Sequence, residues 1–197
     1  MSGPGFAGRI VAAALARPFV YELVQAAAGQ RRVAERLREA AAPLPKSAVL
    51  DVGSASGGFA VRLGMRPVCL DLDPRAVRAL RRAAGFPALA ADAARLPFSD
   101  RRFDLSLCVA VSHHLDDATL SAAIRELARV TSGRLVFLDA LRNDARPISR
   151  WLWRHDRGRH PRTYEELRER IASAFDIREE RRFTVYHHYA LWVASPR

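Results

Sequence analysis

The stretch Val49-Leu50-Asp51-Val52-Gly53-Ser54-Ala55-Ser56-Gly57-Gly58 decides the fold. It opens as a short apolar strand that leads into an acid, and a turn of glycine, alanine and serine follows. Small residues remove the Cβ bulk that keeps a backbone away from a ligand, so this turn allows close approach to a nucleotide-like molecule. A strand, a ligand-binding turn and a helix are therefore predicted in succession.

A second acid follows a second apolar strand, Val68-Cys69-Leu70-Asp71. It lies about 20 residues beyond the first, a distance at which an acid accepts hydrogen bonds from the two hydroxyls of a bound ribose. Together the two segments predict an adenosine-containing cofactor, held at the carboxyl edge of a parallel sheet.

Strands and helices alternate around these segments, with short connections. The strands are predicted at 48–52, 67–70, 88–91, 105–111 and 134–138, and the helices at 58–63, 75–84, 115–130 and 163–175. Two adjacent β-like runs, 176–183 and 186–194, predict an antiparallel ending. This order predicts an α/β fold with a doubly wound, mostly parallel seven-stranded sheet.

The length of 197 residues predicts one domain with a normal core. We divide it into an N-terminal helical cap over 1–45, a cofactor-binding half over 46–140, and a substrate lid with the C-terminal strands over 141–197. Within the cap, residues 18–42 are expected to form two helices separated by Gly29.

The composition indicates a soluble globular protein, expected in the cytoplasm, with 49% apolar and 27% charged residues. The net charge of +11 is unusual, but Lys46 is the only lysine, and such an arginine bias is typical of a GC-rich genome. Cys69 and Cys108 lie within predicted buried strands and indicate neither a disulfide nor a metal site. No apolar run reaches the roughly 18 residues of a membrane span.

Three interpretations of the glycine turn compete. Gly53-x-Ala55-x-x-Gly58 passes as a degraded dinucleotide fingerprint, in which Asp71 would bind the ribose of NAD. A Walker-type phosphate loop is excluded, because no Lys-Ser or Lys-Thr pair follows the turn. The third is an S-adenosylmethionine (SAM) site, which the later segments favour.

Those later segments resemble class I SAM-dependent methyltransferases of the small UbiE-like, or type 11, group. The resemblance covers nearly half the chain, in order and spacing. Its segments are Leu50-Asp51-Val52-Gly53 with Gly57, Leu70-Asp71-Leu72-Asp73-Pro74, Ala91-Asp92-Ala93-Ala94-Arg95-Leu96-Pro97-Phe98, Arg102-Phe103-Asp104-Leu105, Val111-Ser112-His113-His114-Leu115-Asp116 and Gly133-Arg134-Leu135-Val136.

The resemblance implies a role for each matching position. The residues around Gly53 would pack against the methionine part of SAM, Asp71 would bind the ribose, and Leu72 would cover the adenine. Asp92 would accept from the adenine amino group, whereas Asp73 is expected only to cap a helix. The full set of implied cofactor-binding residues is Asp51, Gly53, Ser54, Gly57, Asp71, Leu72, Asp92, Ala93 and Val109, with Ala110 beside the last.

The chain departs from the family inside the turn, where Ala55 replaces the usual central glycine. An alanine costs little there if its φ is negative, and otherwise tightens the site or lowers affinity. This departure leaves open a protein that binds the cofactor without transferring a methyl group.

The implied reaction is in-line attack on the sulfonium methyl, for which the protein mainly supplies alignment. A base is needed only if the nucleophile carries its proton into the reaction. His113 and His114 follow the fourth strand, at the edge where ligands bind, and one of them is a candidate base. The alternative is that the pair shapes the pocket wall.

The sequence says less about the acceptor, the molecule that would receive the methyl group. An Asn/Asp-Pro-Pro-Tyr signature of amino-group methylation is missing after the fourth strand, which favours an oxygen, carbon or other nitrogen nucleophile. The segment 141–162 is rich in arginine and tryptophan, which suits an aromatic or acidic small molecule. The alternatives are an RNA or protein methyltransferase, indicated by the charge, and a non-methylating SAM-binding protein.

Overall fold

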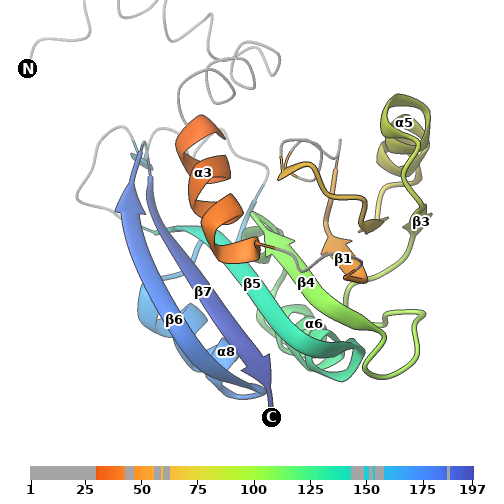
Figure 1. Cartoon of the computed structure of the whole chain (residues 1–197). Coiled ribbons are helices and arrows are strands. Elements are labelled where there is room, and N and C mark those ends of the chain that lie inside the picture. The colour runs from red at the N-terminus through yellow and green to blue at the C-terminus, as the bar shows by residue number, and fades with distance from the viewer. Residues whose placement is uncertain are drawn as a thin grey trace, which may run out of the picture.

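The computed structural model describes residues 30–42, 47–55, 59, 63–142, 149–150, 153, 158–185 and 187–197. Within them a seven-stranded sheet has the order β3-β2-β1-β4-β5-β7-β6 (Figure 1). The strands are β1 (Val49–Val52), β2 (Val68–Asp71), β3 (Ala88–Ala90), β4 (Phe103–Val109), β5 (Thr131–Leu141), β6 (Phe175–Thr184) and β7 (His188–Pro196).

The first five strands pair in parallel, while β7 runs antiparallel to both β5 and β6. This confirms the predicted mostly parallel sheet with an antiparallel ending. The described helices are α3 (Gln30–Ala41), α5 (Pro74–Ala84), α6 (Asp117–Val130) and α8 (Tyr164–Ala172), with a short 3-10 turn η1 (Ser112–His114). The helix expected before Gly29 lies outside the described residues.

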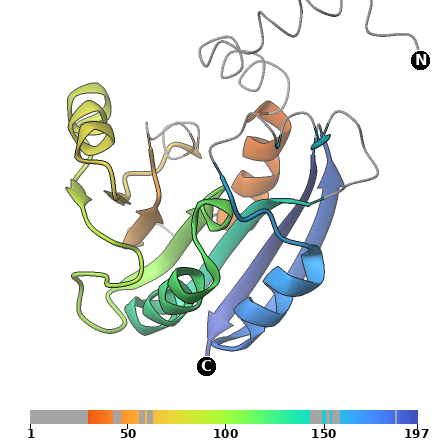
Figure 2. The same cartoon turned by 180° about the vertical axis from the view of Figure 1, so that it is seen from behind.

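Helices cover both faces of the sheet. The helix α3 packs through Val33 and Leu37 on one face, while α6 and α8 cover the other, as the two opposite views show (Figures 1 and 2). Side chains of β5 alternate between the two layers, with Val136 and Leu138 on the α3 side and Leu135 and Phe137 on the α6 side. Burial on both faces explains why β5 has a nearly continuous apolar sequence.

The boundaries after β4 differ from the prediction. A strand was expected over 105–111 and a helix over 115–130, but β4 ends at Val109 and α6 begins at Asp117. Ala110 has a φ of 57°, which turns the chain out of the strand and into η1. Asp116 then caps α6, its side chain accepting from the Thr119 N–H at 2.8 Å.

The two cysteines do not pair. Cys69 lies opposite Asp51 and Cys108 opposite Val52, so β1 separates them, and both thiols are free and buried. Burial raises the pKa of Cys69 to about 12, which makes it a core residue rather than a reactive thiol.

Candidate cofactor site

The turn after β1 requires a glycine at its first position. Gly53 has a φ of 70°, and its N–H donates to the Leu70 carbonyl at 2.7 Å. A Cβ at this position would lie 2.3 Å from Cγ2 of Val111. The glycine thus removes a clash and adopts a conformation that other residues rarely adopt.

Ala55 adopts a φ of 45°, in the left-handed region. The condition under which alanine would cost little, a negative φ, is therefore not met. Left-handed backbone costs an L-residue about 1–2 kcal/mol. A hydrogen bond from the Ala55 N–H to Oδ2 of Asp71, 2.8 Å long, holds the strained turn against β2.

The side chain of Asp71, the last residue of β2, links the turn after β1 to the segment after β2. One carboxylate oxygen accepts from the Ala55 N–H, and the other accepts from the Asp73 N–H at 2.9 Å. Asp73 itself accepts from the Arg75 N–H at 2.8 Å and caps α5, as expected. These bonds fix the Asp71 carboxylate beside the cavity described below.

Leu72, the next residue, exposes 72% of its surface and is the one large hydrophobic side chain recorded as exposed in the described part of the chain. The same side chain lines the cavity described below.

The segment after β3 carries Asp92 and is held by α6. Asp92 Oδ1 accepts from the Ala94 N–H at 2.9 Å, which shapes the turn. Arg129 donates to the carbonyls of Leu96 and Phe98, at 3.0 and 2.7 Å. Glu126 accepts from the Leu96 N–H at 2.7 Å and pairs with Arg129. Neither Glu126 nor Arg129 belongs to a motif, so these contacts could not be predicted from the sequence.

A cavity of about 340 Å³ joins these features at the carboxyl edge of β1, β2 and β4. Its lining contains five of the nine predicted cofactor residues, namely Gly53, Asp71, Leu72, Asp92 and Ala93, and it is completed by Val52, Ala55, Leu70, Ala91, Ala110, Val111, His114 and Leu115. Ser54 and Val109 are adjacent to lining residues but do not line the cavity themselves. Gly57 lies outside the described residues.

Asp51 is buried below the turn, with 5% of its surface exposed. Burial, together with the charge of Asp71, raises the pKa of its carboxyl to about 7. It is therefore an acid that titrates near neutral pH, next in the chain to Val52, which lines the cavity.

His113 and His114 occupy different environments. His114 is exposed and lines the cavity, whereas His113 is buried, with its Nδ1 atom 2.7 Å from Oδ1 of Asp139. Asp139 is fully buried at the end of β5 and also accepts from the Ser112 hydroxyl at 2.5 Å. The sequence did not indicate Asp139, which is 26 residues from His113.

The charge state of Asp139 follows from its contacts. Burial alone would raise its pKa, but the charge and hydrogen bond of His113, with the bonds from Ser112 and the Ala140 N–H, hold that pKa below its ordinary range. Asp139 is thus an ionised acid inside the core.

Arg162, also buried, holds the turn that carries both histidines. Its guanidinium donates to the carbonyls of Ser112 and Leu115, at 2.6 and 2.7 Å, and pairs with Asp117 at 2.9 Å. The turn is therefore held by Arg162, from the segment before α8, as well as by Asp139 of β5.

Aromatic rings continue from His113 toward the β6–β7 hairpin. The Trp153 ring lies edge-on to His113 at 5.4 Å between centroids, and 4.9 Å from the ring of His187. His187 in turn contacts the buried hydroxyl of Ser149 at 2.9 Å. The predicted lid therefore places a tryptophan beside the histidine pair.

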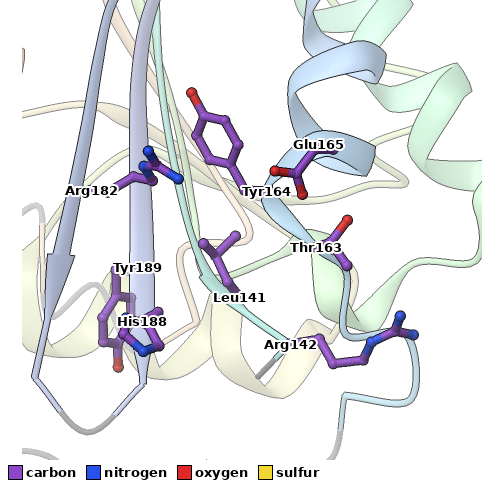
Figure 3. A pocket seen from close by; sticks show the side chains of 8 residues that line it. All are labelled: Leu141, Arg142, Thr163, Tyr164, Glu165, Arg182, His188 and Tyr189. Atoms are coloured by element: carbon purple, nitrogen blue, oxygen red, sulfur yellow. The ribbon is translucent and has the colours of Figure 1, made fainter. Parts of the chain in front are cut away.

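A second cavity of about 280 Å³ lies further along the same edge, beside the start of α8 (Figure 3). Arg142, Arg182, Tyr164 and Tyr189 are among its lining residues, and Arg182 stacks over the Tyr164 ring at 4.7 Å. Tyr164 thus lines this cavity and not the first one. Glu165 also lines the second cavity, so the lining carries both positive and negative side chains.

Two further observations concern the described ranges. They contain no cluster of three or more histidine, cysteine or acidic side chains arranged for a metal ion. None of their helices combines the length and apolarity that crossing a membrane requires.

Solved structures with this fold include several methyltransferases. A SAM-dependent methyltransferase of Methanosarcina mazei superposes with a TM-score of 0.67 at 20% identity, covering 78% of this chain and 94% of that one. Geranyl diphosphate C-methyltransferase of Streptomyces coelicolor, solved with S-adenosyl-L-homocysteine (SAH), gives 0.70 at 15% identity, covering 85% and 81%. The cyclase SpnF gives 0.68 at 20% identity, covering 84% and 80%. No curated protein sequence matches significantly.

A match to a methyltransferase family model, together with the shared fold, supports a class I SAM-dependent methyltransferase, an enzyme that takes SAM as its cofactor. Residues 50–137, a little under half of the chain, match the family model described as a methyltransferase domain, of the type 11 group. The matched range begins within β1, ends within β5 and includes the whole predicted set of cofactor residues.

Proposed function

We propose that the protein transfers the methyl group of SAM to an oxygen, carbon or nitrogen nucleophile of a small organic molecule. The observation that carries the proposal is the cavity, in which Gly53, Asp71, Leu72 and Asp92 come together from three separate connections. Its volume of about 340 Å³ suits a nucleoside-sized ligand.

The residues present fit SAM by their chemistry. The absent Cβ of Gly53 leaves room at the strand end, and Asp71 offers carboxylate oxygens already oriented by two backbone amides. Leu72 offers an exposed apolar surface for the adenine, and Asp92 an acceptor for its amino group. Bound SAM supplies a methyl group on a positively charged sulfur, and Asp51, when ionised, would favour that charge from below.

The base, in this proposal, is one of the two histidines after β4. Both belong to one rigid turn held by Arg162 and Asp139. The protein would align the acceptor and exclude water, which accounts for much of the acceleration when the leaving group is as good as a thioether.

Two observations support a small acceptor. The second cavity presents arginine and tyrosine side chains, which suit an aromatic or acidic molecule. One structural neighbour, solved with geranyl diphosphate, is a methyltransferase of a small molecule. We also propose a cytoplasmic location, which two free buried cysteines favour.

The test is SAH formation from SAM with separate acceptor pools: phenols and phenolic acids, aliphatic alcohols, amines, total RNA, and a protein extract. We expect turnover with a small-molecule pool and none with RNA or protein, and Asp71→Ala should abolish it. Turnover only with RNA, falling steeply with salt, would instead establish the rival that the net charge indicates.

A third outcome concerns the cyclase neighbour. A protein that binds SAM yet forms SAH with no pool would be a member that keeps the cofactor without transferring its methyl group. That result would contradict the proposed function and leave the cofactor assignment intact.

A further inference from the structure

We propose that the second cavity binds an aromatic carboxylate, and that Arg182 of β6 is the specificity-determining residue, because its guanidinium holds the carboxylate. The inference rests on the proposed function in one respect, that the bound molecule is the methyl acceptor. Its starting point is the place of Arg182, which lines the cavity with its guanidinium 4.7 Å over the centre of the Tyr164 ring (Figure 3).

The alternation of side chains along β6 brings Arg182 to this cavity. Successive side chains of a strand point to opposite faces of the sheet. Glu180 contacts Tyr164 and Arg168 of α8, so it lies on the face that α8 covers. Arg182 is two residues further along the strand and faces the same helix. The end of β5, the start of α8 and the start of β7 complete the cavity.

The acid on the same face of β6, Glu180, has other partners. It accepts a hydrogen bond from the Tyr164 hydroxyl and pairs with Arg168 at 3.0 Å. Among the residues that the structure describes, no acid is recorded in an ion pair with Arg182, which is exposed. A ligand that arrives from solvent therefore meets a cation whose charge no ion pair in that part of the chain offsets.

The stacked guanidinium is well placed for a carboxylate. Its N–H groups lie in the plane of the guanidinium, whereas stacking on a ring uses its face. Two parallel N–H groups can then donate to the two oxygens of one carboxylate. The Tyr164 ring is itself held in place, because it stacks on the fully buried Trp192 at 5.4 Å between centroids. The anchor is thus ordered before the ligand binds, which lowers the cost of binding.

The other charges of the lining leave room for one negative charge on the ligand. The lining contains two arginines, Arg142 and Arg182, and one acid, Glu165. The backbone N–H of Thr163 and the charge of Arg142 hold the pKa of the Glu166 carboxyl below its ordinary range. Part of the Arg142 charge is therefore offset by an acid outside the lining, and Arg182 is the stronger candidate anchor.

The rest of the lining suits a single aromatic ring. Leu141 and the Tyr164 ring supply apolar surface, and the His188 ring is held by a contact of 2.8 Å between its Nδ1 atom and the Thr184 hydroxyl. The volume of about 280 Å³ is small for a ligand site. A ring with one carboxylate, such as a hydroxybenzoate or a hydroxycinnamate, matches this size and these surfaces.

One residue connects the walls of the two cavities. Arg162 precedes Thr163 of the second cavity in the chain and donates to the carbonyl of Leu115, which lines the cofactor cavity, at 2.7 Å. On this ground we assign the carboxylate to the acceptor. Its hydroxyl or amino group forms a bond to the methyl carbon, the carbon–sulfur bond breaks with its electron pair going to sulfur, and the displaced proton goes to water. The products are the methylated acid and SAH.

The first measurement is calorimetric binding to the full-length protein, with SAH present and absent. The probes are 4-hydroxybenzoate and 4-hydroxycinnamate, each compared with the alcohol that replaces its carboxylate, 4-hydroxybenzyl alcohol and 4-hydroxycinnamyl alcohol. We expect at least one acid to bind about tenfold or more tightly than its alcohol, as a charged hydrogen bond predicts. Equal binding within both pairs, or no binding of either acid, would overturn the inference.

The second measurement repeats the titration with variants of β6. Arg182→Gln should weaken binding of the acid by roughly 10- to 100-fold and leave the alcohol unaffected. Arg182→Lys keeps the charge but loses the planar fork, so its affinity should lie between the two. Arg178→Gln is the matched control, because Arg178 is an exposed arginine of the same strand that pairs with Asp176 at 3.8 Å and does not line the cavity. Unchanged affinity in a cooperatively unfolding Arg182→Gln contradicts the anchor.

Glu165 gives a test of the opposite sign. Glu165→Gln removes the negative charge from the lining, so it should strengthen binding of the acid several-fold at low salt and leave binding of the alcohol as it was. Weaker binding of the acid in this variant would mean that the site favours a cation, and would count against a carboxylate.

The outcomes separate the two proposals. In SAH assays, we expect turnover with an acid, and Arg182→Gln should raise its KM by the factor found in calorimetry while kcat changes little. SAH formation from uncharged acceptors alone would overturn the assignment of the carboxylate to the acceptor. Failure to form SAH with any pool contradicts the proposed function, whereas the effect of Arg182→Gln on carboxylate binding needs no turnover.

Discussion

Ala55 carries the clearest local strain in the cofactor site. Its φ of 45° places an alanine where the family usually has glycine. We predict that Ala55→Gly stabilises the protein by about 1 kcal/mol, because relief of the left-handed conformation exceeds the added entropy of the unfolded chain. Urea unfolding measures this change.

The matched control is Ala48→Gly, just before β1, where no positive φ is recorded. It should destabilise the protein by roughly 0.4–1 kcal/mol. If Ala55→Gly destabilises the protein as much as the control does, the turn is not strained as described.

Asp51 predicts a pH-dependent stability. Its folded-state pKa of about 7 lies above the ordinary 3.8, so between these values the folded protein holds a proton that the unfolded chain has lost. The stability that Asp51 contributes is complete below about pH 4 and falls as the pH rises to 7. We predict that Asp51→Asn removes this fall and raises the Tm at pH 8 by several degrees.

The same substitution should weaken SAM binding at pH 8, because it removes a negative charge under the cavity. Thermal unfolding at pH 5 and pH 8 provides the comparison, with Asp176→Asn, an exposed acid, as control. An equal change in Tm at both pH values would show that Asp51 does not titrate near neutrality.

At the scale of elements, α6 acts on the cofactor site through the segment after β3. Arg129 and Glu126 hold the backbone of Leu96 and Phe98, downstream of Asp92. We predict that Arg129→Ala weakens SAM binding by about tenfold and speeds amide exchange over 94–100, because two carbonyls and Glu126 lose their partner.

Arg125→Ala provides the control, since Arg125 is an exposed residue of the same helix. It should change neither quantity. Normal affinity in Arg129→Ala, despite faster exchange, would mean that the segment does not position Asp92 for the cofactor.

At the scale of the whole molecule, the sequence predicted the sheet because its signals are local. Apolar runs mark the buried strands, Asp73-Pro74 and the Thr163–Glu166 capping box mark two helix starts, and the acids at β1 and β2 mark the ligand edge. Two adjacent β-like runs predicted the antiparallel ending, but no local pattern indicated that β7 lies between β5 and β6.

The rest depends on contacts between residues far apart in the sequence. The Asp139 partner of His113, the Arg162 clamp on η1 and the Arg129 clamp are made by side chains in segments without a motif. The φ of Ala55 is set by its bond to Asp71 across the turn, which no residue type reveals. The sequence therefore predicted which edge of the sheet carries the candidate cofactor site, but not the residues that hold its turns in place.

The most direct test of the central claim is calorimetric binding of SAM, SAH and NAD to the wild type and to Asp71→Ala. We predict micromolar binding of SAM and SAH, no binding of NAD, and loss of SAM and SAH binding in the variant, which should still unfold cooperatively. Binding of neither SAM nor SAH to the wild type, or a preference for NAD, would contradict the cofactor site and the methyltransferase that it defines.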